Sequence, residues 1–216
     1  SFSYWRGESA ARQLLSADAT LTRLSEALVS YGLVYFSGIT LSLFDQQGLE
    51  RLWTLLRALR GASVRIAFDG NYRPRVWASK ERAQSVFETA LRHSDIALPT
   101  FDDEQQLFDD KSPSDTLERI HHYGVSEVVL KVGPEGCWVS GDVEPQQIKG
   151  SAVTQPVDTT AAGDSFNAGY LSGRLHNDSM LDAAHLGNRL AEIVIGHRGA
   201  IVPRSAMSHL NSLPRR

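Results

Sequence analysis

The stretch VDTTAAGDSFNAG, residues 157–169, carries the strongest signal for fold and chemistry in this sequence. Its small residues at 161–163 let a ligand approach the backbone closely, and a helix is expected over 162–176. The first amide N–H groups of a helix lack partners within it and, together with the helix dipole, suit a phosphate group. Asp164 lies in this first turn, where a carboxylate can accept a hydroxyl proton during phosphoryl transfer. The spacing of these residues alone also allows another interpretation, in which Asp164 and the glycine serve the helix dipole and packing and carry no chemistry.

On the N-terminal side of this stretch, short apolar segments alternate with amphipathic helical patterns. Strands are expected at 33–36, 64–68, 95–98 and 127–132, with 137–140 as a hairpin partner of the last. Helices are expected at 45–60, from a cap at Ser79, from Ser112-Pro113, and at 179–197. This alternation predicts an α/β fold with a mostly parallel sheet covered by helices, in which ligands bind beyond the carboxyl ends of the strands.

The composition excludes several classes of protein. With Lys+Arg 22 and Asp+Glu 25 in 216 residues, the net charge is −3, which argues against a nucleic-acid partner. The single cysteine, Cys137, excludes an internal disulfide and fits a cytoplasmic protein. The absence of a long apolar run argues against a membrane partner, and the scattered histidines lack the spacing of a zinc site.

The run DTTAAGDSFNAGYL, residues 158–171, resembles the C-terminal signature of the ribokinase-like sugar kinases, the phosphofructokinase-B family. The resemblance implies a three-layer α/β/α sandwich with a mostly parallel central sheet. It also implies that Asp164 is the catalytic base and that Ala161, Ala162 and Gly163 form the anion hole. Most members of that family have glycine where this sequence has Ala161, and we expect the extra methyl group to be tolerated if the local φ is negative.

Two further segments resemble the bacterial 2-keto-3-deoxygluconate kinases within that family. They are the opening Tyr4-Trp5-Arg6 and the segment DGNYRPRVW at 69–77. The resemblance implies a sugar-acid substrate, which suits guanidinium groups because they bind carboxylates through two hydrogen bonds. Without the resemblance, each arginine would be taken as a solvated loop charge. The implied substrate-binding residues are Tyr4, Trp5, Arg6 and Arg73, with Arg75 a weaker candidate, and the implied ATP-binding residues here are Asn71, Tyr72 and Arg73.

The segment KVGPEG at 131–136 resembles the turn on the nucleotide side of that family. Glycines there let a ligand approach the backbone closely, and a lysine can bind phosphate as a point charge. A strand that ends in such a turn is common without any ligand. The implied ATP-binding residues are Lys131, Val132, Gly133, Pro134, Glu135 and Gly136, together with Gly163.

The acidic segment TFDDE at 100–104 occupies the place where many members of the family carry Asn-x-x-Glu, which is linked to Mg²⁺ and phosphate. Thr100 replaces the asparagine. Asp103 and Glu104 are the candidate Mg²⁺ residues, acting through water. The alternative is an ordinary helix N-terminus rich in acidic residues.

Together these features predict ATP-dependent phosphorylation of 2-keto-3-deoxygluconate to its 6-phosphate, with Asp164 as general base and with ATP and Mg²⁺ bound. A related kinase acting on fructose or 2-ketogluconate and a non-catalytic fragment are the alternatives. The resemblance extends from Ser1 to about Met207 and covers the later part of a typical family member. We therefore expect 1–216 to form a single ribokinase-like domain without the N-terminal strands and with 1–6 as a remnant of the lid. Most of the lid, through which the family commonly forms homo-oligomers, is then expected to be missing.

Overall fold

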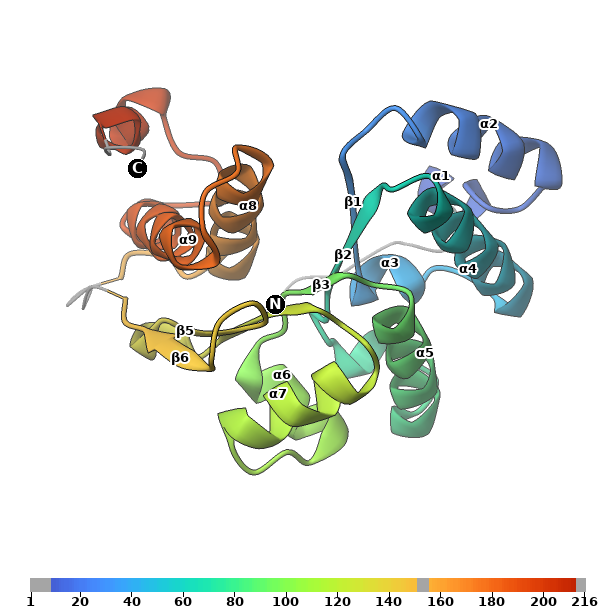
Figure 1. Ribbon diagram of the computed structural model, residues 1–216, viewed down its shortest axis with the longest axis horizontal. Helices are drawn as coiled ribbons and strands as arrows, with labels where there is room; N and C mark the ends of the chain where they lie inside the picture. The colour runs from blue at the N-terminus through green and yellow to red at the C-terminus, as the bar shows by residue number, and fades with distance from the viewer. Residues whose placement is uncertain (1–8, 151–155, 213–216) are drawn as a thin grey trace. The chain divides into compact units, whose positions relative to one another are not determined.

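The computed structural model describes residues 9–150 and 156–212 (Figure 1). Its internal contacts divide the chain into two compact units. The first unit comprises residues up to Pro99 together with 103–126, and the second comprises 100–102 and the residues from Glu127 onward. Tyr4, Trp5 and Arg6 lie outside the described residues. Among those described, no helix is both long enough and apolar enough to cross a membrane.

The first unit contains three parallel strands. Strand β2 (Arg65–Asp69) pairs with β1 (Leu33–Ser37) on one side and with β3 (Ile96–Ala97) on the other. Four of the five residues of β2 are buried, as expected for a central strand of a parallel sheet. The helical segments that belong mainly to this unit are α1 (Ala10–Gln13), α2 (Asp18–Leu28), α3 (Gly38–Leu41), α4 (Gln46–Gly61), η1 (Pro74–Val76), α5 (Lys80–Arg92), α6 (Phe101–Phe108) and α7 (Pro113–His122).

The helix starts expected from the sequence are confirmed by their capping hydrogen bonds. Asp45 accepts a hydrogen bond from the amide of Gly48, and Ser79 accepts one from the amide of Arg82. Ser112 and Asp115 form a reciprocal capping box at the start of α7. These side chains satisfy amides that the helices leave free, which fixes where each helix begins.

Aromatic side chains on β2 and α5 fill the core of the first unit. The ring of Phe68 lies 5.1 Å from that of Phe36 and meets Phe87 edge to face at 5.4 Å. Gly38 lies so close to the carbonyl oxygen of Gly70 and the ring of Phe87 that a Cβ atom would clash with both. The start of α3 is therefore packed directly on the end of β2.

The second unit has antiparallel strands and two long helices. Strand β4 (Glu127–Lys131) pairs with β5 (Cys137–Ser140), which pairs with β6 (Gln146–Ile148), so the predicted hairpin is confirmed. Thr100 also forms a parallel bridge with Lys131. The helical segments are η2 (Gly133–Glu135), α8 (Ala162–Leu175), α9 (Met180–Ile195) and η3 (Arg204–Ser212).

The sheet is therefore mixed: the strands of the first unit pair in parallel, whereas β4, β5 and β6 pair antiparallel. The antiparallel pairings follow from two short connections, the Gly-Pro-x-Gly turn between β4 and β5 and residues 141–145 between β5 and β6, which are too short for a crossover to a parallel strand.

Helices α8 and α9 pack against each other through glycines. A Cβ atom on Gly169 would lie 2.9 Å from the Cα atom of Gly187, and one on Gly187 would lie 3.0 Å from the carbonyl oxygen of Phe166. A Cβ atom on Gly173 would likewise lie 3.0 Å from the Cα atom of Ala183. The two backbones thus approach too closely for larger residues at these positions.

The close contact at Gly169 gives a testable prediction. Gly169→Ala should lower the free energy of unfolding by about 1–3 kcal/mol, because the new methyl group must push α9 away. Gly61→Ala is the matched control: no atom lies within 4 Å of its added Cβ, so the better helix propensity of alanine should raise stability by about 0.5–1 kcal/mol. Urea unfolding of both variants measures the difference, and equal effects would contradict the packing described here.

Candidate active site

Helix α8 starts from an unusual backbone conformation. Ala161, its N-cap residue, has φ +61° and ψ 19°, so the condition under which the extra methyl group was expected to be tolerated, a negative φ, is not met. The left-handed conformation is strained for any residue with a Cβ atom and favours glycine. It turns the chain so that the first turn of α8 faces outward, with Asp164 exposed.

The amides at this helix start are partly free, as the sequence predicts for an anion site. The amide of Ala162 donates to the carbonyl oxygen of Thr159 at 3.2 Å. Within the described part of the chain, the amides of Ala161, Gly163 and Asp164 have no hydrogen-bond partner. Three donors at the positive end of a fourteen-residue helix can therefore meet a phosphate group.

Asp158 fixes the loop that leads into α8, a role that the sequence interpretation missed. Its carboxylate accepts hydrogen bonds from the amides of Thr160 and Gly199, each at 2.9 Å. Hydrogen bonds from Thr160 and from the Gly199 amide lower the pKa of Asp158 to about 2. The available signal was an aspartate at the entry to a turn, because an aspartate side chain often accepts a hydrogen bond from the backbone amide two residues later, here that of Thr160.

Lys131 brings a positive charge to the same helix end. It is the last residue of β4, it is buried, and its Nζ donates to Oδ1 of Asn167 at 2.9 Å. A Cβ atom on Gly163 would lie only 3.9 Å from Nζ, so the ammonium group lies beside the first turn of α8. Lys131 and Gly163, both implied by the resemblance to bind ATP, thus lie side by side within the second unit. Asn167 was not singled out from the sequence.

The turn after β4 is closed by the amide of Val132, which donates to the carbonyl oxygen of Gly136 at 2.9 Å. Gly133 and Gly136 have φ values of +60° and +93°, which side chains disfavour. A Cβ atom on Gly136 would clash with the backbone of Ile148 and Gly150. Residues 133–135, which include Pro134 and Glu135, remain exposed and can meet a ligand.

In the first unit, the predicted ligand-binding loop follows β2. Asn71 has φ +41°, and its Oδ1 atom is buried without a hydrogen-bond partner among the described residues. Asp69 is buried and accepts a hydrogen bond from the hydroxyl of Tyr35 at 3.0 Å. Strain and an unsatisfied buried oxygen in one loop are typical of a functional site. Tyr72, in contrast, is buried against Phe87, so its side chain belongs to the core.

Arg73 lies in the same loop and is held within it. Its Nη1 donates to the carbonyl oxygen of Tyr72 at 2.7 Å and to both carboxylate oxygens of Asp103 at 3.3 Å. The Arg73 side chain remains 54% exposed, so the rest of the guanidinium group is accessible to a carboxylate or phosphate. The structure thus brings together two predicted site residues, one cationic and one acidic.

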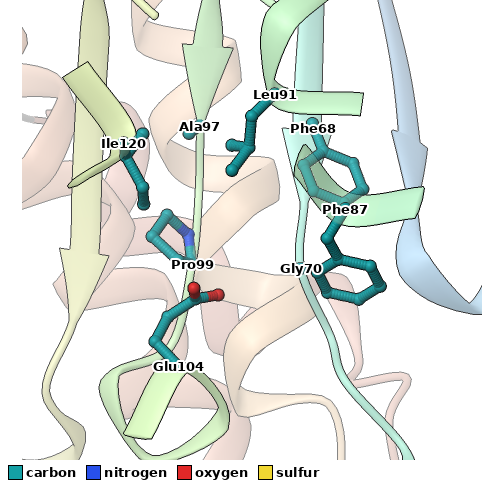
Figure 2. A pocket seen from close by; sticks show the side chains of 8 residues that line it. All are labelled: Phe68, Gly70, Phe87, Leu91, Ala97, Pro99, Glu104 and Ile120. Atoms are coloured by element: carbon teal, nitrogen blue, oxygen red, sulfur yellow. The ribbon is translucent and has the colours of Figure 1, made fainter. Parts of the chain in front are cut away.

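Glu104 does not fit the expected role as a Mg²⁺ residue. Figure 2 shows its carboxylate beside Pro99 at one end of a largely apolar cavity. Its Oε2 accepts a hydrogen bond at 2.7 Å from Nη2 of Arg119, which also donates to Asp110. Burial, together with the nearby Asp110 and Asp103, raises the pKa of Glu104 to about 7, against the attraction of Arg119. A buried carboxylate already bound to arginine is a poor ligand for a hydrated cation.

Asp103 is the more accessible of the two predicted Mg²⁺ residues. Its side chain is 17% exposed and paired with Arg73, so it fits a metal only through water. Within residues 9–150 and 156–212, no group of three or more histidine, cysteine or acidic side chains is arranged to hold a metal ion.

Free helix amides and a buried lysine at the carboxyl end of a strand form an arrangement suited to phosphate in an α/β protein. The chain belongs to the pfkB family of carbohydrate kinases, because the model of that family matches residues 1–207. It is 43% identical over 210 residues to the 2-dehydro-3-deoxygluconokinase of Escherichia coli K12, a match that covers 95% of this chain and 67% of that protein.

Solved structures agree on the fold. A PfkB protein from Polaromonas sp. JS666 matches with a TM-score of 0.80 at 22% identity, over 98% of this chain and 66% of that one. A fructokinase from Vibrio cholerae O395, solved with fructose, ADP and calcium, matches with a TM-score of 0.69 at 25% identity, over 78% of this chain and 56% of that one. The chain has the ribokinase-like α/β fold, and it spans about two-thirds of the length of the E. coli kinase.

The strain at Ala161 predicts a stabilising substitution. Ala161→Gly should raise the free energy of unfolding by about 1 kcal/mol, because glycine adopts the left-handed conformation without steric cost. Ala162→Gly is the control, since the neighbouring residue is helical and should lose about 0.5–1 kcal/mol. Chemical unfolding curves measure both values, and a loss of stability in Ala161→Gly would contradict the observed backbone conformation.

The raised pKa of Glu104 predicts a pH dependence of stability. Between the ordinary value of 4.5 and about 7, the folded state binds more protons than the unfolded state, so stability should fall as pH rises through this range. The expected loss is on the order of 3 kcal/mol, from about 1.4 kcal/mol per pKa unit. Glu104→Gln should abolish this slope in unfolding experiments from pH 4.5 to 8. A slope that persists in this variant would assign the titration to another group.

Proposed function

We propose that this chain catalyses the ATP-dependent phosphorylation of 2-dehydro-3-deoxygluconate (2-keto-3-deoxygluconate) at its terminal hydroxyl group, giving the 6-phosphate. The observation that carries the proposal is the exposed Asp164 in the first turn of α8, beside free backbone amides and the ammonium group of Lys131. The name of the E. coli relative supports the choice of substrate.

In the proposed reaction, Asp164 accepts the proton of the attacking hydroxyl group as the oxygen bonds to the γ-phosphorus of ATP. The bond from that phosphorus to the bridging oxygen of ADP breaks at the same time. The amides of Ala161, Gly163 and Asp164 stabilise the negative charge on the transferring group, because they are fixed before the substrate arrives. Lys131 adds a positive charge on the nucleotide side.

The residues proposed to bind ATP are suited to an anionic ligand. The free amides, Lys131 and the exposed turn at 133–135 supply donors and space in the second unit. In the first unit, the unsatisfied Oδ1 of Asn71 fits a polar group of a ligand. Mg²⁺, when bound with ATP, would reduce the charge on its phosphate oxygens, and Asp103 is the residue available to contact it through water. Consistent with the use of ATP, we place the reaction in the cytoplasm.

For the sugar acid, we propose that Arg73 binds the carboxylate. Its guanidinium group is oriented by the carbonyl oxygen of Tyr72 and by Asp103, which leaves its other nitrogens for two parallel hydrogen bonds to a ligand. Tyr4, Trp5 and Arg6 complete the proposed set and stay predictions from the sequence.

The experiment that tests the proposed base is Asp164→Asn. The rate of ADP production with 2-dehydro-3-deoxygluconate should fall by about 10²–10⁴, because the amide of asparagine cannot accept the proton. Asp142→Asn, the same change at an exposed residue of the second unit, is the control and should leave the rate unchanged. Equal rates in wild type and Asp164→Asn would refute the proposed mechanism.

The substrate is tested by comparing 2-dehydro-3-deoxygluconate, 2-ketogluconate and fructose in the same coupled assay. We expect the first to have the highest kcat/KM and fructose the lowest, since fructose has no carboxylate for Arg73. Arg73→Gln should reduce the difference in kcat/KM between the sugar acids and fructose, mainly by raising KM for the acids. Equal kcat/KM for fructose and the keto-deoxy acid would contradict the proposed specificity.

A further inference from the structure

We infer that Glu104 is a positioning residue that holds the loop after β2, residues 70–73, in the conformation in which Arg73 binds the sugar acid. The inference rests on the proposed function for the identity of that ligand. Glu104 lies on α6 within the first unit and is only 3% exposed. Its carboxylate and Gly70, the first residue of the loop, lie at the same end of the cavity in Figure 2.

The orientation of the Glu104 carboxylate is set by Arg119. Its Oε2 accepts a hydrogen bond from Nη2 of Arg119 at 2.7 Å. Asp110 holds Arg119 in turn, because its carboxylate accepts hydrogen bonds from Nε at 3.0 Å and from Nη2 at 2.6 Å. The guanidinium carbon also lies 3.8 Å from the centre of the Phe108 ring. A side chain fixed in this way can in turn fix the backbone that it contacts.

The backbone that Glu104 contacts is that of Gly70. A Cβ atom on Gly70 would lie 3.0 Å from Oε1 of Glu104 and 3.6 Å from the ring of Phe87. The carbonyl oxygen of Gly70 also lies against Gly38, where a Cβ atom would clash with it. Gly70 is thus enclosed by three elements, and the carboxylate of Glu104 is one of the groups that set the direction in which the chain leaves β2.

The residue before Glu104 holds the other end of the same loop. Asp103 accepts hydrogen bonds from Nη1 of Arg73 at 3.3 Å. Consecutive residues of α6 therefore contact the first and the last residue of the loop. Between these contacts Asn71 has φ +41°, and a strained conformation persists only where its surroundings determine it. Glu104 supplies such a surrounding at the start of the loop.

The consequence for binding concerns the alignment of Arg73. A guanidinium group binds a carboxylate through two parallel hydrogen bonds, so a small displacement of the loop weakens both. Fructose has no carboxylate and should be much less sensitive to such a displacement. Glu104 therefore acts through Arg73, and its loss should appear in KM for the sugar acid and much less in kcat.

Glu104→Ala tests the inference because it removes the contact with Gly70. We expect KM for 2-dehydro-3-deoxygluconate to rise about tenfold, with kcat and KM for fructose changed by about twofold or less. Glu104→Gln keeps the length of the side chain and an oxygen for Arg119, so it should restore KM to nearly the wild-type value. Leu107→Ala, at a buried apolar residue of the same helix, is the control: it should lower the urea midpoint of unfolding and leave KM unchanged.

Gly70→Ala tests the same contact from the opposite side. The φ of Gly70 lies outside the left-handed region, so alanine suits the backbone, but its methyl group would press on Oε1 of Glu104. This variant should also raise KM for the sugar acid. The double variant with Glu104→Ala should have a KM no higher than that of Glu104→Ala alone, because the crowded oxygen is gone. A KM that rises by the product of the two single effects would contradict the inference.

Hydrogen exchange tests the position of the loop without a sugar or turnover. The amides of Val76 and Trp77 bind the carbonyl oxygens of residues 73 and 74, so their exchange reports on the end of the loop. In Glu104→Ala they should exchange at least about tenfold faster, while the amides of residues 50–60 in α4 exchange as in wild type. An equal increase in both segments would assign to Glu104 a role in stability alone and would overturn the inference.

These two kinds of measurement separate the inference from the proposed function. A chain that phosphorylates 2-dehydro-3-deoxygluconate with the same KM in wild type and Glu104→Ala would support the activity and overturn the inference. A chain that phosphorylates none of the sugars tested, but whose amides at Val76 and Trp77 exchange faster in Glu104→Ala alone, would refute the proposed activity and support the positioning of the loop by Glu104.

Discussion

The buried contact between Glu127 and the pair Tyr170 and Arg174 is the interaction on which the second unit depends. It attaches the C-terminal half of α8 to the first residue of β4, which fixes the position of the helix along the strand. The N-terminal turn of α8 is thereby placed beside Lys131. Removing one partner would leave a buried charge uncompensated, which is far more costly than the loss of an exposed ion pair. The geometry of the anion site is thus secured about three helical turns away from it.

The close packing of α8 on α9 complements this contact. Glycines at 169, 173 and 187 allow the two backbones to touch, so the helices form one rigid pair. The polar contacts fix α8 along β4, and the glycines fix its distance from α9. The proposed role of Asp164 as the base would benefit from this rigidity, because a small displacement of its carboxylate would lower the rate of proton transfer.

The sequence predicted those features that depend on local patterns. Apolar periodicity located β1, β2, β4 and the long helices, and the caps at Asp45, Ser79 and Ser112 were readable because capping is a short-range interaction. The signature at 158–171 located the helix start and Asp164. Side-chain contacts between residues far apart in the sequence could not be predicted. No local pattern indicates that Asn167 binds Lys131 or that Glu104 binds Arg119. The sign of φ at Ala161 could not be predicted from the sequence, because alanine usually avoids positive φ and the tertiary fold overrides that preference here.

The two hydrogen bonds of Asp158 close the segment before α8 onto the residues after α9. One carboxylate oxygen binds the amide of Thr160 and the other binds the amide of Gly199, so the loop that carries the anion site is tied down at its entry. A loop that is already ordered loses little conformational entropy when it takes up a ligand. The conformational entropy of this loop is thus already lost during folding, and the proposed binding of phosphate there would cost little further backbone freedom.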